Sequence, residues 1–118
     1  MSADAVAQAR RWYWQRISAM VLVLCVVVHL AVMVVAVRGG LSAAEILGRT
    51  RGHWGFAAFY TVFVLACAVH VPTGIATIAR EWGRLGARAA LWLGRAFAAV
   101  IVVAGLRAVV AVFSGGSA

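Results

Sequence analysis

Three long apolar runs dominate the hydrophobic pattern of the chain, at about residues 17–37, 55–79 and 89–113. Each run is as long as the roughly 20 residues that a helix needs to cross a ~30 Å hydrocarbon layer. Lipid offers the backbone no hydrogen-bond partners, so such runs are expected to be helical. The pattern therefore predicts an all-α membrane protein with three transmembrane helices, forming a single membrane domain over residues 1–118.

The composition agrees with a multi-pass protein of the lipid bilayer. The chain is 65% hydrophobic and 12% charged, whereas a soluble domain is roughly half apolar and a quarter charged. Eleven basic residues, all arginine, stand against three acidic residues, for a net charge of +8. The arginines gather at the ends of the apolar runs rather than on one soluble face. They therefore indicate membrane topology and argue against nucleic acid as a partner.

The distribution of arginines predicts the orientation in the membrane. A cytoplasmic N-terminus puts six arginines on the cytoplasmic side and three in the outer loop, which favours this orientation with the C-terminus outside. The cytoplasmic six are Arg10, Arg11, Arg16, Arg80, Arg84 and Arg88, and the outer three are Arg38, Arg49 and Arg51. Within the outer loop, the stretch LSAAEILG is predicted to form a short helix on the membrane surface.

Few polar side chains fall at membrane depth, and each is a functional candidate because burying it in lipid is costly. They are His29, His70, Arg95 and Arg107. No aspartate or glutamate lies deep in any run. Proton-coupled small exporters generally need such a carboxylate, so a transporter has no evident means of coupling here.

Membrane histidines without carboxylates suit haem ligation, in which one ring nitrogen binds iron and the other donates to a polar neighbour. Gly74 follows His70 by one helical turn on the same face, which leaves room for a porphyrin to approach. Pro72 is expected to bend the helix around the macrocycle. The alternative is an imidazole that hydrogen-bonds across helices, with Gly74 as a packing contact.

The two histidines are expected near mid-membrane. At 1.5 Å per residue, His29 lies ~18 Å and His70 ~14 Å from the inner boundary. The two histidines of one chain would then bind the same haem from two helices. Alternatively, each histidine would bind a separate haem together with a histidine of a partner chain, giving two haems at different depths. Arg16, Arg80 and Arg95 are candidate partners for the anionic propionates of an inner haem. Ordinary topology signalling or snorkelling is the alternative role for such arginines.

Two stretches resemble a known family. CAVHVPTGIATIAREWGR is similar to the second membrane helix of the anchor subunits of succinate dehydrogenase and fumarate reductase, with His70, Gly74, Ile75 and Glu81 at the family's offsets. WQRISAM resembles the QR-[VI]-[ST]-[AG] element that opens the first helix of these cytochrome b-type anchors. The resemblance covers about residues 12–84.

The resemblance implies a non-catalytic electron-transfer subunit in the bacterial inner membrane. Such anchors hold a flavoprotein and an iron–sulfur subunit on the cytoplasmic face, bind haem b, and carry electrons from the iron–sulfur subunit to quinone. His70 would be an axial haem ligand, and Arg16 would lie near both the quinone head group and a propionate. The anchor would belong to a larger helical bundle with a second anchor subunit or a second copy of this chain.

The quinone contacts implied by the resemblance are Arg16, Ser18, Tyr13 and Trp82. Trp82 stands where one anchor type has an aromatic hydroxyl, so that role would pass to Tyr13 or to the companion anchor. Trp12 replaces a serine of the other anchor type.

His29 is an additional membrane histidine in the first helix. Two-haem members of the superfamily carry ligands on both the first and second helices, which favours His29 as ligand of a second, outer haem. A single haem with His29 as a packing residue is the alternative. Two other functions remain open, a b-type cytochrome subunit of another quinone-linked oxidoreductase and a non-redox small membrane protein.

Overall fold

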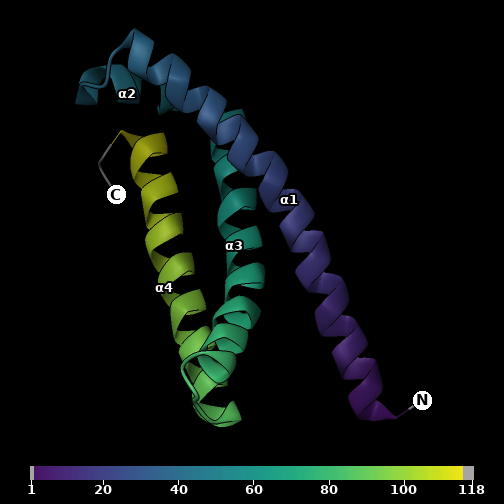
Figure 1. The fold of residues 1–118 in the computed structure, drawn as a ribbon. Helices are drawn as coiled ribbons and strands as arrows, with labels where there is room; N and C mark the ends of the chain where they lie inside the picture. Colours follow the sequence, from purple (N-terminus) through teal and green to yellow (C-terminus); the bar gives the residue numbers. More distant parts are fainter. Residues whose placement is uncertain (1, 116–118) are drawn as a thin grey trace.

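The computed structural model describes residues 2–115, which form four helices joined by short connections (Figure 1). The helices are α1 (Ala3–Gly39), α2 (Ala43–Thr50), α3 (Trp54–Glu81) and α4 (Ala87–Ser114). Three of them, α1, α3 and α4, are long and apolar enough to cross a membrane, which confirms the three predicted spans. The short helix expected within the loop between the first two spans is α2.

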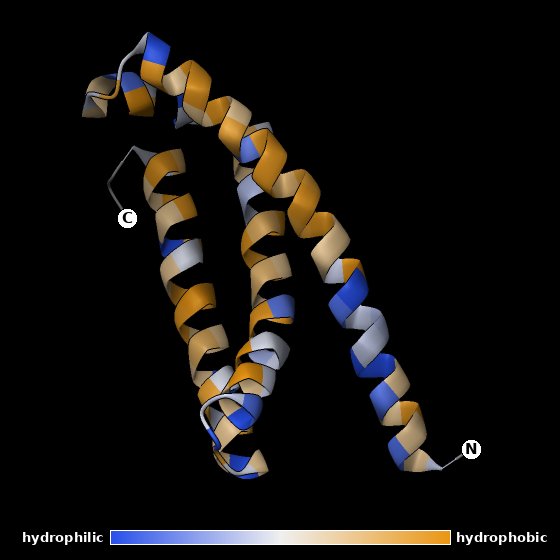
Figure 2. Ribbon diagram, viewed as in Figure 1, coloured by the Kyte–Doolittle hydropathy of each residue, from blue (hydrophilic) through white to orange (hydrophobic). Residues whose placement is uncertain are grey.

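The first helix is much longer than its apolar run, because it begins at Ala3 rather than at residue 17. Ser2 caps it by accepting a hydrogen bond from the backbone N–H of Ala5 at 3.2 Å. The intervening segment is rich in alanine, arginine and glutamine, which are strong helix formers despite their polarity. Figure 2 shows this N-terminal part as a mixture of polar and weakly apolar positions, followed by the apolar span. Hydrophobicity alone marked only the apolar part of the helix.

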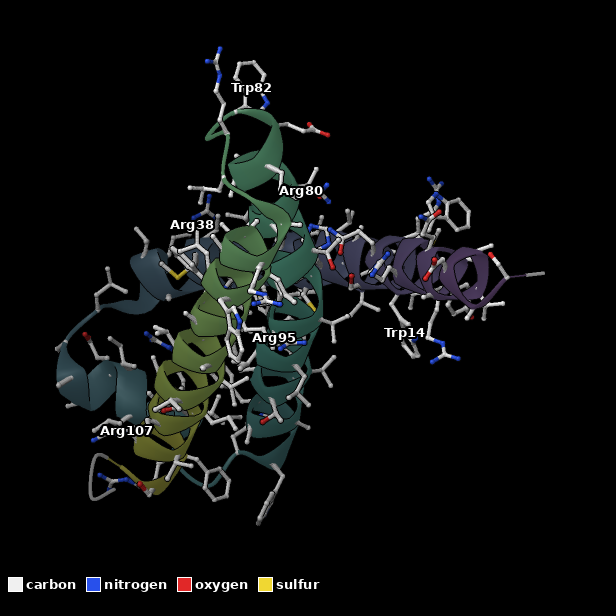
Figure 3. All side chains as sticks on the ribbon, turned by 90° about the horizontal axis from the view of Figure 1, so that it is seen from below. Trp14, Arg38, Arg80, Trp82, Arg95 and Arg107 are labelled. Carbon is white, nitrogen blue, oxygen red and sulfur yellow. The ribbon has the colours of Figure 1, made fainter. Side chains whose placement is uncertain are left out.

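The helix α3 lies between α1 and α4 and runs antiparallel to both (Figure 1). It packs closely along α4, whereas α1 crosses it and diverges from it toward the N-terminal end. Seen along the bundle, the N-terminal part of α1 again extends away from the other two helices (Figure 3). The N-terminal end of α1 and the α3–α4 connection therefore lie at the same end of the molecule but well apart.

Small residues allow the close contact between α3 and α4. Ala79 and Ala90 are buried, and Ala90 is completely inaccessible. A Cβ added at Gly94 would lie only 2.5 Å from the carbonyl oxygen of Pro72. At Gly105 it would lie 2.7 Å from the side chain of Val64. Such small-residue contacts are a common way for helices to associate in lipid, where dispersion rather than hydrophobicity holds them together.

The segment containing α2 covers the C-terminal end of α4. The Thr50 hydroxyl donates to the carbonyl of Val112 at 2.8 Å, and the Gly52 N–H donates to the carbonyl of Phe113 at 2.9 Å. These bonds satisfy carbonyls that the end of a helix leaves without intrahelical partners. At its own start, α2 has a capping box between Ser42 and Glu45.

Most large apolar side chains on the spans are exposed in the single chain. Leu24 is 69% exposed, Val100 65% and Val35 64%. Water would penalise such exposure, whereas lipid tails or the helices of a partner would not. The surface of the chain is therefore that of a protein of the lipid bilayer.

Candidate functional site

His70 and Ser18 meet where α1 crosses α3. The Nδ1 atom of His70 lies 3.3 Å from the Ser18 hydroxyl oxygen, and Ser18 is only 4% exposed. The same hydroxyl donates to the carbonyl oxygen of Gln15 at 3.0 Å. A serine hydroxyl has a single proton to donate. With Ser18 donating it to the carbonyl of Gln15, the contact with His70 is a hydrogen bond only when Nδ1 carries a hydrogen and donates it to the Ser18 oxygen. This tautomer leaves a lone pair on Nε2, the form in which histidine binds a metal.

The Nε2 atom of His70 has no hydrogen-bond partner among residues 2–115. A cavity of about 330 Å³ lies beside the ring. Its lining is Gln15, Arg16, Ala19, Met20, Val23 and His70. We call it the His70 cavity.

Gln15 is the polar group of this cavity that sequence patterns did not single out. Its Oε1 atom is buried and has no hydrogen-bond partner. A buried acceptor without a donor costs about 1–3 kcal/mol, so a bound group that donates a proton here would be favoured. Gln15 precedes Arg16 in the QR element of the sequence, but only the packing of α1 on α3 reveals its burial.

Gly74 has little packed against it on the side of α3 where its Cβ would point. A Cβ added at Gly74 would meet only the amide nitrogen of Gln15, at 3.8 Å, which is an ordinary contact. The bend expected at Pro72 stays a prediction. The backbone of Pro72 packs against Gly94 of α4, so this residue also contributes to the α3–α4 contact.

His29 lies further along α1, against an aromatic cluster of α3. Its Nδ1 atom is 2.9 Å from the hydroxyl oxygen of Tyr60. The ring also makes edge-on contacts with Tyr60 and Phe63, with centroids 5.7 Å apart in both cases. As at His70, Nδ1 is engaged by a hydroxyl, and Nε2 has no partner among the described residues. Tyr60 was not predicted as a site residue, since an aromatic residue in a span is more often packing than chemistry.

The two histidines lie at clearly different depths. His70 is level with Ser18, and His29 is eleven positions further along α1, which corresponds to ~16 Å of helix. Counting from the ends of the apolar runs had placed the two rings within a few ångströms in depth. That estimate was wrong because the apolar run of α1 is offset along α3. One chain therefore cannot clamp one iron between His29 and His70.

The three candidate propionate arginines are separated in the structure. Arg16 lines the His70 cavity, and its guanidinium lies 5.1 Å from the ring centroid of Trp12. Arg95 is exposed on α4 and stacks on its own helix neighbour Trp92, at 5.2 Å. Arg80 lies near the end of α3 and lines a different hollow. Arg80 and Arg95 are labelled on separate helices in Figure 3. Only Arg16 is brought to His70.

The four predicted quinone contacts do not converge. Ser18 is behind His70 rather than in the wall of the cavity. Tyr13 is 54% exposed with its ring against Trp14, and Trp82 is 83% exposed. Figure 3 shows Trp82 beyond the end of α3 and Trp14 out along the diverging part of α1. Within this chain, Arg16 and Gln15 are the polar side chains that face the space beside His70.

No group of three or more histidine, cysteine, aspartate or glutamate side chains that could hold a metal ion occurs among residues 2–115. Comparisons with protein-family models, with curated proteins and with solved structures found no significant match.

Proposed function

We propose that this chain is a membrane anchor subunit of a succinate:quinone oxidoreductase, which binds haem b through His70 and a quinone beside it. The observation that carries the proposal is the state of His70. Its Nδ1 lies within hydrogen-bond distance of a buried hydroxyl, and its Nε2 has no partner among residues 2–115; Arg16 and Gln15 line the cavity beside the ring. The family resemblance of the surrounding sequence supports the same function.

The residues present fit haem ligation by one imidazole. The Ser18 hydroxyl lies within hydrogen-bond distance of Nδ1 and would orient the His70 ring, and a Cβ at Gly74 would meet only Gln15. When bound, the haem supplies one-electron storage, with a potential tuned by its axial ligands and burial. A second protein ligand for the haem would come from a companion anchor or a second copy, because His29 is too far from His70. Arg16 is the propionate partner that this chain offers.

His29 repeats the arrangement at the other level of the α1–α3 contact. The Nδ1 atom of His29 is within hydrogen-bond distance of the Tyr60 hydroxyl, as Nδ1 of His70 is of the Ser18 hydroxyl. We therefore favour His29 as ligand of a second, outer haem over a purely packing role. The supporting observation is that Nε2 of His29 has no hydrogen-bond partner among residues 2–115.

Quinone binding would use Arg16 and Gln15. The Arg16 guanidinium would hold the oxygen of a bound quinone and would stabilise negative charge there. The Oε1 atom of Gln15 is a buried acceptor without a partner, so it would suit the hydroxyl of the reduced quinol and not the carbonyl of the oxidised form. Gln15 would thus favour the quinol.

The partners and orientation follow from the same proposal. The end that carries Arg80 and the α3–α4 connection would face the bacterial cytoplasm, where the flavoprotein and iron–sulfur subunits bind. Electrons would reach the quinone from the iron–sulfur subunit. The chain itself would not bind succinate or fumarate, so its role is non-catalytic.

The decisive experiment is a reduced-minus-oxidised spectrum of the purified membrane complex. A b-type alpha band that is lost in His70→Leu, together with a co-purifying flavoprotein, is expected. Ser18→Ala should keep the band but shift its midpoint potential, because the imidazole loses its hydrogen-bond partner. A colourless wild-type complex would refute the haem assignment.

A non-redox membrane protein is the second candidate. The observation in its favour is that each membrane histidine already has a cross-helix hydrogen bond within the chain. Under that function His70→Leu would affect only stability, and no partner with a flavin would co-purify. A b-type cytochrome of another oxidoreductase would show the alpha band with a different soluble partner.

A further inference from the structure

A groove lies between the diverging N-terminal part of α1 and the adjoining ends of α3 and α4. It consists of three hollows of about 410, 340 and 600 Å³. They adjoin one another, because Arg11 and Thr73 line the first and second, and Thr77, Arg80 and Ala87 line the second and third. We call this the arginine groove.

The charge of the groove is strongly one-sided. Arg10, Arg11 and Arg80 line it, and Glu81 is the one acidic residue in its wall. None of these arginines forms an ion pair within residues 2–115. Arg11 belongs to α1 and Arg80 to α3, so the two side chains line the same hollow from two sides. An anionic group between Arg11 and Arg80 would neutralise both.

Away from the arginines the wall of the groove becomes apolar. Val69, Pro72 and Leu91 line it at the depth of the spans. The hydroxyl of Thr77 is satisfied by the carbonyl of Thr73 at 2.8 Å, so it adds little polarity. A cationic end that continues into an apolar channel matches a molecule with an anionic head and a hydrocarbon tail.

We propose that the arginine groove binds one anionic phospholipid, with its phosphate between Arg11 and Arg80 and an acyl chain along Val69 and Leu91. Basic pockets between transmembrane helices are typical sites for anionic head groups. An acidic soluble partner fits less well, because the hollow that Arg11 and Arg80 share continues along Pro72 and Leu91 at the depth of the spans. The phospholipid belongs to the leaflet at the α3–α4 connection.

The groove is separate from the His70 cavity, so this proposal does not depend on haem or quinone. Gln15 lies between the two spaces and lines both. Arg11 and Arg16 are five positions apart on α1, which turns them ~140° from each other around the helix. Arg11 accordingly faces the groove, whereas Arg16 faces the cavity.

Native mass spectrometry of the full chain, released from detergent with phosphatidylglycerol or phosphatidylcholine added, tests the proposal. We expect one phosphatidylglycerol to be retained, with an affinity at least tenfold above that for phosphatidylcholine. Arg11→Gln combined with Arg80→Gln should reduce that affinity at least tenfold. The corresponding lysine variants keep the charge and should lose less than about threefold, which also shows that the sites tolerate substitution.

The matched control is Arg84→Gln combined with Arg88→Gln. It removes the same charge from the same end of the molecule, but these two residues do not line the groove. An equal loss in both double variants would show general attraction and overturn the proposal, as would no loss in either. Displacement of the lipid by millimolar inorganic phosphate would show that the groove binds only the phosphate group, and this would also overturn the proposal. Circular dichroism of each variant confirms that the helices have formed.

Discussion

The contact of Gly94 with Pro72 gives a sharp prediction about the packing of α3 on α4. A Cβ at Gly94 would lie 2.5 Å from the Pro72 carbonyl oxygen, and ordinary contact begins at 3.4 Å. The helices must therefore separate by 3.4 − 2.5 = 0.9 Å to accept Gly94→Ala. Overpacking of this kind costs about 1–3 kcal/mol.

The matched control is Gly74→Ala, the same substitution in the interior of a neighbouring span. Its Cβ would meet only Gln15, at 3.8 Å. Both variants gain the same intrinsic helix propensity, about 1 kcal/mol, so the difference between them isolates the packing effect.

Reversible unfolding of the full chain in mixed micelles, followed by circular dichroism, measures the free energies of unfolding of the two variants. Gly94→Ala should be about 1–3 kcal/mol less stable than Gly74→Ala. Equal stability of the two, or a larger loss in Gly74→Ala, would refute the close approach of the two helices at Pro72.

Three further predictions concern polar contacts. Thr50→Val removes the hydroxyl that donates to the carbonyl of Val112. We expect the free energy of unfolding to fall by about 0.5–1.5 kcal/mol and hydrogen exchange in the last turn of α4 to become faster. Unchanged exchange would contradict this cap. Ser42, the N-cap residue of α2, lowers the pKa of Glu45 below its ordinary value of 4.5, first through its backbone N–H and then through its side chain. The stabilisation of α2 by the Glu45 carboxylate should thus be complete above pH 4.5 and disappear as the pH falls through the lowered pKa. Hydrogen exchange of the α2 amides, followed as a function of pH, measures this loss, and Glu45→Gln is the control that should not respond to pH. The hydrogen bond between His29 and Tyr60 can be tested by a double-mutant cycle of His29→Leu and Tyr60→Phe, with unfolding in micelles as the measurement. We expect a coupling free energy of about 0.6 kcal/mol, which is typical of a hydrogen bond between membrane helices. A coupling of zero would mean that the two side chains do not interact.

Local signals in the sequence determined the three long apolar helices and the short helix α2. The three apolar runs are each long enough to cross a membrane, and this length requires no knowledge of packing. The helix α2 was also predictable, since the serine and glutamate of its capping box are three residues apart. The beginning of α1 was missed because helix propensity, not hydrophobicity, carries the helix on toward the N-terminus.

Only the tertiary structure decided which side chains meet. The sequence marked His70, Gly74 and Arg16 as candidates, but the register of α1 on α3 placed Ser18 behind His70 and separated His29 from it. A shift by one residue on a helix turns a side chain by ~100°, so the pattern along one chain cannot fix contacts between two helices. For the same reason Arg16 faces the His70 cavity while its near neighbour Arg11 faces the groove.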